Sequence, residues 1–178
     1  EATLARFGRL DILVNNAGVA DNGDFDSFDD KRLAGIMDTN FNAPFRIARA
    51  AVKPMLAQGG GVVLNIGSIS GYVANVPQKQ VAYNASKAAV HQMSTVMAYE
   101  YAGRNIRVNA LAPGYVISDM TKGGLEKPEW KNTWAAGTPM GRFGEPEEMA
   151  TCALFLCSPA SSYVTGAVLV ADGGYLTH

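Results

Sequence analysis

The stretch "GVVLNIGSISG", residues 61–71, joins an apolar run to a loop of glycine and serine. The run, residues 62–66, carries β-branched and other apolar side chains on both faces, as expected for a strand that helices cover above and below. Similar short runs recur along the chain, and longer stretches with helical periodicity separate them. This alternation predicts an α/β fold with a doubly wound parallel sheet. The other predicted strands cover residues 12–14, 106–111 and 167–170, and the predicted helices cover residues 29–38, 40–57, 82–102 and 145–158.

The first ten residues, "EATLARFGRL", read as the end of an amphipathic helix that runs directly into the strand "DILV". No strand with a glycine-rich turn precedes it. A doubly wound sheet that binds a nucleotide uses such a first βα unit to hold pyrophosphate. We therefore expect residues 1–178 to form the C-terminal part of a single domain, with the first βα units absent from this chain.

Composition narrows the possible partners and the compartment. The 178 residues are 48% hydrophobic and carry 15 basic against 16 acidic side chains, so no cationic surplus favours a nucleic acid or an anionic membrane. No apolar run approaches the roughly 20 residues that cross a bilayer, and no signal-peptide pattern opens the chain, which predicts a cytoplasmic protein. Cys152 and Cys157 have no accompanying histidine, so we interpret them as buried thiols and predict no metal site.

Small and polar residues follow three of the predicted strands. These segments are "NNAG" at 15–18, "GSISG" at 67–71 and "PGY" at 113–115. Ligands of a parallel sheet bind outside the carboxyl ends of its strands, so the three segments predict one common site. Their glycines are expected to let a flat ligand approach the backbone closely.

The segment "YNASK", residues 83–87, places a phenol and an ammonium four positions apart at the start of a predicted helix. That spacing stacks Tyr83 and Lys87 on one helical face. A phenol with a pKa near 10 is a poor base at neutral pH, and an adjacent ammonium favours the phenolate. Such a pair is a weak signal alone, and its value depends on the surrounding segments.

Five short segments, "NNAG", "MDTN", "GSISG", "YNASK" and "LAPGYV", occur in an order and at separations that resemble the short-chain dehydrogenase/reductase family. The ending, residues 140–174, resembles the C-terminal part of the same family, so the resemblance covers essentially the whole chain. It implies a Rossmann-type fold and hydride transfer between an alcohol and a carbonyl compound with NAD or NADP.

The resemblance also implies four catalytic residues. Tyr83 is the expected general acid/base, Lys87 lowers its pKa and holds the nicotinamide ribose, and Ser68 bonds the substrate oxygen, with Ser70 as the second choice. The fourth is Asn40. Pro44, four residues later, lacks the N–H that would bond the Asn40 carbonyl, which leaves that oxygen free for a water of the proton relay. The alternative is that Pro44 only kinks a helix whose second half Asn40 caps.

The same resemblance predicts how the cofactor is held. The segment Asn16, Ala17 and Gly18 is expected beside the adenine ribose. Pro113, Gly114 and Val116 are expected to hold the nicotinamide carboxamide, and Ser118 replaces a frequent threonine. The choice between NAD and NADP stays open, because the residue that reads the ribose 2′ position follows a strand this chain lacks.

The residues that contact the substrate are predicted from polar loop residues and from a segment that covers the site. Residues 118–142 are expected to cover the site, and for Trp130 and Trp134 we favour packing against the body over closure on a substrate. Asn75 and Gln78, with Ser68, Ser70 and Tyr83, are the expected substrate contacts. The chain looks closest to polyol dehydrogenases of the galactitol or sorbitol type. A 3-oxoacyl-carrier-protein reductase and a noncatalytic interaction module are the alternatives, and the apolar tail, residues 164–178, predicts a homotetramer.

Overall fold

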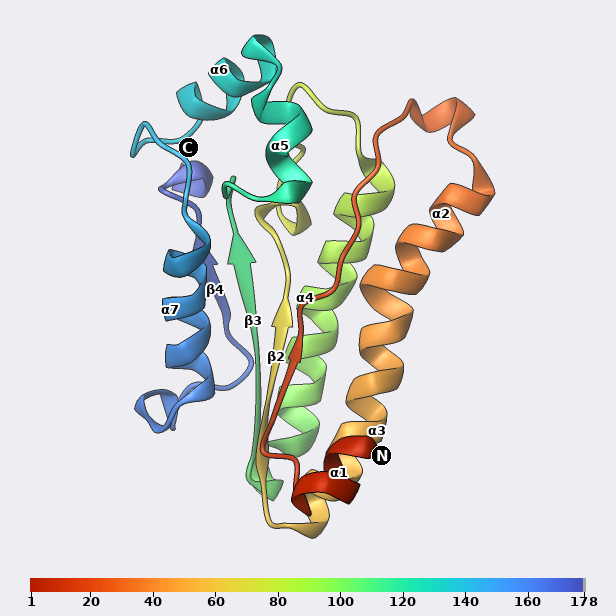
Figure 1. Cartoon of the computed structure of the whole chain (residues 1–178), viewed down its shortest axis with the longest axis vertical. Coiled ribbons are helices and arrows are strands. Elements are labelled where there is room, and N and C mark those ends of the chain that lie inside the picture. The colour runs from red at the N-terminus through yellow and green to blue at the C-terminus, as the bar shows by residue number, and fades with distance from the viewer. Residues whose placement is uncertain (178) are drawn as a thin grey trace.

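A computed structural model of the chain describes residues 1–177 and contains one sheet of four parallel strands (Figure 1). The strands are β1 (Ile12–Asn15), β2 (Gly61–Ile66), β3 (Ile106–Pro113) and β4 (Val168–Ala171), and they lie in this order across the sheet. Leu13 pairs with Val63, and Val63 with Val108. The predicted parallel α/β fold is confirmed, and each strand lies within two residues of its expected limits.

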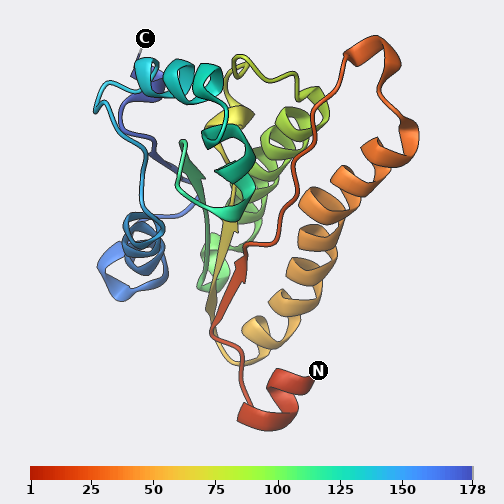
Figure 2. The same cartoon turned by 45° about the horizontal axis from the view of Figure 1, so that its top comes forward.

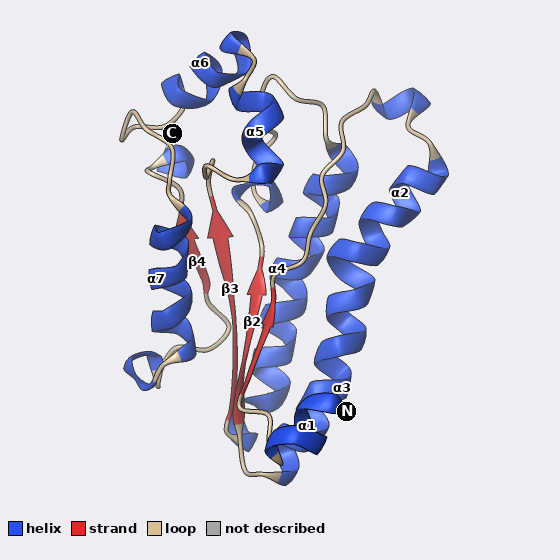
Figure 3. Ribbon diagram, viewed as in Figure 1, coloured by secondary structure: helices blue, strands red, loops and turns tan. Residues whose placement is uncertain are grey.

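Helices cover both faces of this sheet. Three helices lie on one face, and α7 (Pro146–Cys157) lies on the other (Figures 1 and 3). The first three are α2 (Asp30–Met37), α3 (Ala43–Ala57) and α4 (Val81–Tyr101). Met55 and Val63 belong to the core beneath α3 and α4, whereas Leu64 and Leu156 belong to the core beneath α7. Neighbouring residues of β2 therefore pack into the cores on opposite faces of the sheet, as a doubly wound sheet requires.

A widened turn joins α2 to α3 without breaking the helical rod. The turn is a π-helical segment, η2 (Asp38–Asn42), in which the N–H of Ala43 donates to the carbonyl of Asp38. Pro44 follows in the first turn of α3. Because proline has no N–H to donate, a π-type turn is a common way to accommodate it. The turn places Asn40, which is 1% exposed, against the body of the protein.

Two short helices lie above the carboxyl ends of the strands. They are α5 (Asp119–Leu125) and α6 (Pro128–Ala136), and the view in Figure 2 brings them forward. They form within the segment 118–142 that the sequence predicts as a cover. The first helix, α1 (Ala2–Phe7), ends at Gly8 and lies at the opposite end of the molecule (Figure 1). Shorter 3-10 turns are η1 (Phe25–Ser27), η3 (Ile69–Gly71), η4 (Ala102–Arg104), η5 (Pro159–Ser161) and η6 (Tyr175–Thr177).

The outer edge of the sheet is formed by β1. Ile12 and Val14 on this strand are 45% and 46% exposed, which is unusual for apolar side chains of a parallel sheet. Within residues 1–177, no helix is both long enough and apolar enough to cross a membrane.

Candidate active site

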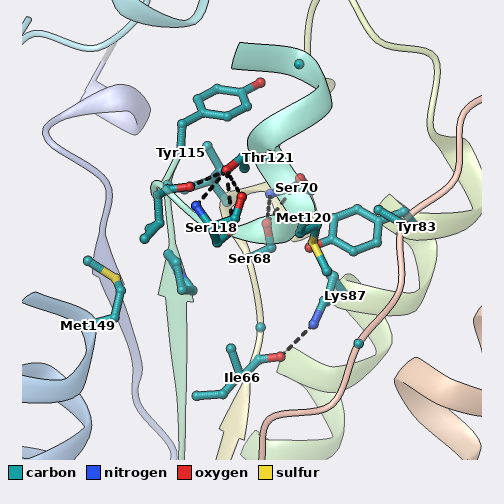
Figure 4. Close-up of a pocket in the computed structure, with 18 of the residues that line it drawn as sticks. Ile66, Ser68, Ser70, Tyr83, Lys87, Tyr115, Ser118, Met120, Thr121 and Met149 are labelled. Carbon is teal, nitrogen blue, oxygen red and sulfur yellow. Dashed lines mark hydrogen bonds between the residues drawn. The ribbon is translucent and has the colours of Figure 1, made fainter. Parts of the chain in front are cut away.

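A cavity of about 1000 Å³ opens at the carboxyl ends of the strands (Figure 4). Its walls come from the segments that follow β1, β2 and β3, from the start of α4, and from α5 and α6. All the predicted cofactor and substrate residues line it: Asn16, Ala17, Gly18, Ser68, Ser70, Asn75, Gln78, Tyr83, Lys87, Pro113, Gly114, Val116 and Ser118. Segments spread over a hundred residues of chain therefore meet at one place, as the strand-end argument predicts.

Tyr83 and Lys87 lie in the first two turns of α4 and face this cavity (Figure 4). They are 8% and 4% exposed, and the Lys87 ammonium lies 5.6 Å from the centre of the Tyr83 ring. The spacing of four residues within a helix puts the two side chains on one face. The pairing inferred from "YNASK" is therefore present in the fold.

Burial controls the ionisation of both groups. It raises the pKa of Tyr83, and a hydrogen bond with the Ser68 hydroxyl acts in the opposite direction. Burial also lowers the pKa of Lys87 to about 8, and the ammonium donates to the carbonyl of Ile66 over 2.8 Å. The pKa of Tyr83 is thus raised rather than lowered as the sequence predicted, because burial has the largest effect on it. Tyr83 is therefore a protonated phenol at neutral pH, ready to donate.

The two serines that follow β2 bond to each other. Ser68 donates its hydroxyl hydrogen to the Ser70 oxygen over 3.1 Å, and its own oxygen accepts the Ser70 N–H over 3.1 Å. Only Ser68 also bonds Tyr83, whereas Ser70 accepts a hydrogen bond from Gln80. This arrangement agrees with the ranking of Ser68 above Ser70. Gln80 lines the cavity as well and was missed, because an amide before a helix carries no distinctive sequence signal.

Asn40 does not line the cavity, but its side chain bonds residues of two segments that form the cavity wall. Its Oδ1 accepts the N–H of Val19 over 2.8 Å, and its Nδ2 donates to the carbonyl of Val19 over 2.9 Å and to Ser86 over 3.0 Å. The alternative in which Asn40 caps α3 is wrong, because its side chain bonds these two residues instead. Ser86 donates in turn to the carbonyl of Tyr83 over 2.7 Å. Ser86 was missed, although it stands inside "YNASK".

The predicted cofactor residues line two sides of the cavity. Asn16, Ala17 and Gly18 follow β1 and lie on the side of Lys87, and the others follow β3. A Cβ added at Gly18 would lie 3.5 Å from both the Asn40 oxygen and the Lys87 ammonium, so this loop passes directly over the pair. An ammonium has three donors, and that of Lys87 makes one hydrogen bond among the described residues. Two donors are left beside a loop of small residues, which fits the hydroxyls of a dinucleotide ribose.

Three glycines at the strand ends are explained by protein neighbours. A Cβ at Gly67 would lie 2.2 Å from the His91 ring, and one at Gly71 would lie 2.5 Å from the same ring. A Cβ at Gly114 would lie 2.7 Å from the Cα of Asp172. The packing of the protein itself thus requires glycine at these positions, and Gly67 and Gly114 also line the cavity, where the expected approach of a flat ligand stays a prediction.

Asn75 and Gln78 reach the cavity, but other protein groups hold their amides. Asn75 donates to the Tyr115 hydroxyl over 3.1 Å, and Gln78 donates to the same hydroxyl over 3.0 Å. Gln78 also accepts the indole N–H of Trp134 over 3.0 Å. Each NH2 group thus uses one of its two N–H donors on Tyr115, and the predicted contacts of both amides with a substrate stay a prediction. Tyr115 was missed as the centre of this network, because its partners lie 37 and 40 residues away.

The two tryptophans of α6 have different environments. Trp134 is 4% exposed and stacks on Tyr115 with 4.3 Å between ring centres, which confirms packing against the body. Trp130 is half-buried at the cavity wall, and the Lys127 ammonium lies 4.4 Å from the centre of its ring. Ser118 opens α5, and its hydroxyl lies 3.2 Å from that of Thr121 (Figure 4).

Comparison with characterised proteins shows relatives that are dehydrogenases and reductases. Residues 1–176 match the family described as enoyl-(acyl carrier protein) reductase. The chain is 51% identical over 166 residues to galactitol 2-dehydrogenase (L-tagatose-forming) of Cereibacter sphaeroides, covering 93% of this chain and 65% of that protein. It is 40% identical over 171 residues to a 3-oxoacyl-(acyl-carrier-protein) reductase of Chlamydia muridarum, covering 96% of this chain and 67% of that protein.

Solved structures agree with these relatives. A gluconate 5-dehydrogenase from Burkholderia cenocepacia, in complex with NADP and tartrate, superposes with a TM-score of 0.95 at 33% identity, over 99% of this chain and 69% of that one. A short-chain type dehydrogenase/reductase from Mycobacterium marinum gives 0.95 at 37% identity, over 99% of this chain and 69% of that one. The chain thus spans about two thirds of the length of its relatives. On these matches, and with four of the five quoted segments lining one cavity, the chain belongs to the short-chain dehydrogenase/reductase family.

Proposed function

We propose that the protein is an NAD(P)-dependent oxidoreductase that interconverts a secondary alcohol and a ketone, with a sugar alcohol or similar polyhydroxy compound as substrate. The observation that carries the proposal is the meeting of Tyr83, Ser68 and Lys87 at one cavity wall, with Tyr83 bonded to Ser68. A proton donor, a hydrogen-bonding hydroxyl and a cation at one place are what carbonyl reduction requires.

Each of these residues has a proposed task. When bound, NAD(P) supplies or accepts the hydride at the substrate carbon. In the reducing direction, the Tyr83 phenol gives its proton to the substrate oxygen, and the Ser68 hydroxyl bonds that same oxygen. In the oxidising direction, the hydroxyl proton moves to Tyr83. Lys87 holds the ribose hydroxyls, and its charge stabilises the phenolate that remains after the proton has left. Asn40 keeps the loop after β1 at the correct distance from α4.

A polyol substrate is favoured over a substrate that is attached to an acyl carrier protein. The galactitol 2-dehydrogenase relative is 51% identical to this chain, against 40% for the acyl-carrier reductase. A carrier protein is acidic and needs a basic surface beside the site. On the cover, Lys122, Lys127 and Lys131 are offset by Glu126 and Glu129. The 3-oxoacyl-carrier-protein reductase stays as the second candidate, because the matching family description names an acyl carrier protein.

The decisive experiment measures turnover in the full-length protein. The absorbance of the reduced nicotinamide is followed with NADH and NADPH against polyols, ketoses and a β-ketoacyl thioester. Tyr83→Phe keeps the ring and removes the proton donor, so activity should fall to background. Tyr99→Phe on the same helix is the matched control, because Tyr99 is 89% exposed and far from the cavity wall. Turnover that survives Tyr83→Phe contradicts the task assigned to Tyr83, and the absence of turnover in the parent protein contradicts the proposed activity and favours a noncatalytic module.

We also propose that this chain is the C-terminal part of a larger single domain, in which a further βα unit pairs with β1. The exposed Ile12 and Val14 and the greater length of the relatives support this arrangement. A homotetramer and a cytoplasmic location remain predictions of the sequence. Exposed apolar side chains such as Leu154 and Tyr163 are consistent with subunit contacts, and light scattering tests them. The last residue of the predicted contact tail, His178, lies outside the described residues.

A further inference from the structure

His91 is a buried side chain next to the cavity-lining residues Gly67 and Ser68, and the proposed mechanism does not use it. It lies one turn of α4 beyond Lys87, so Tyr83, Lys87 and His91 share one helical face. The residue is 7% exposed, and its ring lies beneath the loop that follows β2. Its Nε2 accepts the N–H of Ser68 over 3.3 Å.

Three successive residues at the end of β2 are each anchored by a hydrogen bond. The carbonyl of Ile66 accepts from Lys87 over 2.8 Å, and the N–H of Gly67 donates to the carbonyl of Leu111 over 2.7 Å. The N–H of Ser68 donates to His91. The last bond is the one that fixes the backbone from which the Ser68 hydroxyl projects.

The surroundings are shaped to hold the imidazole ring. Gly67 and Gly71 flank it, and a Cβ at either position would lie 2.2 Å or 2.5 Å from a ring atom. Tyr72 closes a further side, with 4.7 Å between the ring centres and an angle of 37° between the planes. The ring is thus confined by two glycines and an aromatic side chain, which leaves it little freedom to turn away from Ser68.

The protonation state of the ring follows from its contacts. Because Nε2 accepts a hydrogen bond, a neutral ring carries its hydrogen on Nδ1. That Nδ1 is buried and has no hydrogen-bond partner among the described residues. Burial and the positive charge of Lys87 lower the pKa of His91 to about 4, so the ring is neutral near pH 7. An apolar side chain here would avoid the unpaired donor, but it could not accept the Ser68 N–H.

We propose that His91 is a positioning residue, which holds the backbone of Ser68 so that the Ser68 hydroxyl meets Tyr83 and the substrate oxygen. This inference rests on the proposed function, because it assigns His91 a part in the same reaction. The role differs from simple packing, because it depends on a hydrogen-bond acceptor at the position of Nε2.

Two substitutions in the full-length protein separate the acceptor from the volume of the ring. His91→Leu keeps an apolar filling and removes the acceptor, so kcat should fall about tenfold or more, with little change in the KM of the substrate or the Kd of the nicotinamide. His91→Gln places an amide oxygen near the former Nε2, so kcat should recover at least several-fold. Ser94→Ala, on the same helix as His91, is the matched control: it removes the buried acceptor of the Asn65 amide of β2, and it should lower Tm while kcat stays unchanged.

Nitrogen NMR of the imidazole gives a readout that needs no turnover. The sequence holds two histidines, so the His91 signals are assigned by their loss in His91→Gln. The expected result is a neutral ring at pH 7 with its hydrogen on Nδ1. A ring protonated on Nε2, a charged ring, or a His91→Leu variant that folds and keeps kcat within twofold of the parent overturns the proposal. Absence of turnover in the parent protein refutes the proposed function instead, and the NMR result still decides whether the His91–Ser68 bond exists.

Discussion

The side chain of Asn40 and the backbone of Val19 bond to each other in both directions, at 2.8 and 2.9 Å. The pair lies 21 residues apart in sequence and joins the π-helical turn between α2 and α3 to the loop after β1. An amide is the natural side chain for this contact, because it can donate and accept at once. The side chain of Asn40 therefore ties the loop after β1 to the body of the protein at Val19.

Asn40→Ala should destabilise the protein by about 2–4 kcal/mol, because it leaves the Val19 N–H and carbonyl without their partners. Urea unfolding followed by circular dichroism measures the change. Asn42→Ala is the control in the same turn, since the Asn42 amide bonds only the exposed Asp38 and its loss should cost under about 1 kcal/mol. Equal losses in the free energy of unfolding for the two substitutions would show that the Val19 contact stabilises the protein no more than the Asn42 contact does.

Gly67→Ala should destabilise the protein by about 1–3 kcal/mol, because its methyl group would overlap the His91 ring. Thermal unfolding is the measurement. Gly35→Ala in α2 serves as the control, because a methyl group there meets nothing within 4 Å and alanine favours the helix. The double variant Gly67→Ala with His91→Ala should be more stable than Gly67→Ala alone. Strictly additive losses would mean that the ring is not the obstacle.

Trp134→Phe should loosen α6 from the cavity wall, because it removes the indole N–H that Gln78 accepts. The expected loss is about 1–2 kcal/mol of local stability, since the Gln78 oxygen is left unpaired in a buried place. Hydrogen exchange of the α6 amides measures this loosening, and exchange in α4 should stay as in the parent. Trp130→Phe is the comparison, because this ring also lies at the cavity wall, whereas the bond to Gln78 comes from Trp134. Unchanged exchange in α6 would contradict the predicted role of the bond.

The stability of the cofactor-free protein should rise with pH between about 8 and 10. The pKa of Lys87 is lowered to about 8 in the folded state, against 10.5 in the unfolded chain. Between these values the unfolded chain binds more protons than the folded protein, so the free energy of unfolding increases with pH. Lys87→Met should flatten the slope, with a difference of about 2 kcal/mol over this window. Parallel pH profiles of parent and variant, from urea unfolding, would refute the lowered pKa.

The sequence predicted those features that depend on local pattern. The apolar runs located all four strands within two residues, and "YNASK" correctly paired Tyr83 with Lys87, because a helix fixes residues four apart on one face. Pro44 pointed to an irregular helix, and the structure has a π-helical turn there. These inferences need only the neighbouring residues.

Features that depend on distant partners were not predictable in the same way. The sequence marks Gly67 and Gly71 as positions without a side chain, but the His91 ring that takes the space lies 20 or more residues away along the chain. The hydrogen bonds from Asn75 and Gln78 to the Tyr115 hydroxyl were not foreseen, because nothing local in the sequence links these residues. The pKa of Tyr83 was misjudged for a related reason: a motif reveals the nearby charge and not the depth of burial.

The edge-on contact of Tyr175 with Tyr115, with 5.4 Å between ring centres, has a practical consequence for handling the protein. Tyr175 lies in η6, a few residues from the end of the sequence, and Tyr115 stacks on Trp134 of α6. A change to the Tyr175 ring is therefore only two aromatic contacts from the cover of the cavity. Kinetic constants of material modified or substituted at Tyr175 should be compared with those of the parent protein.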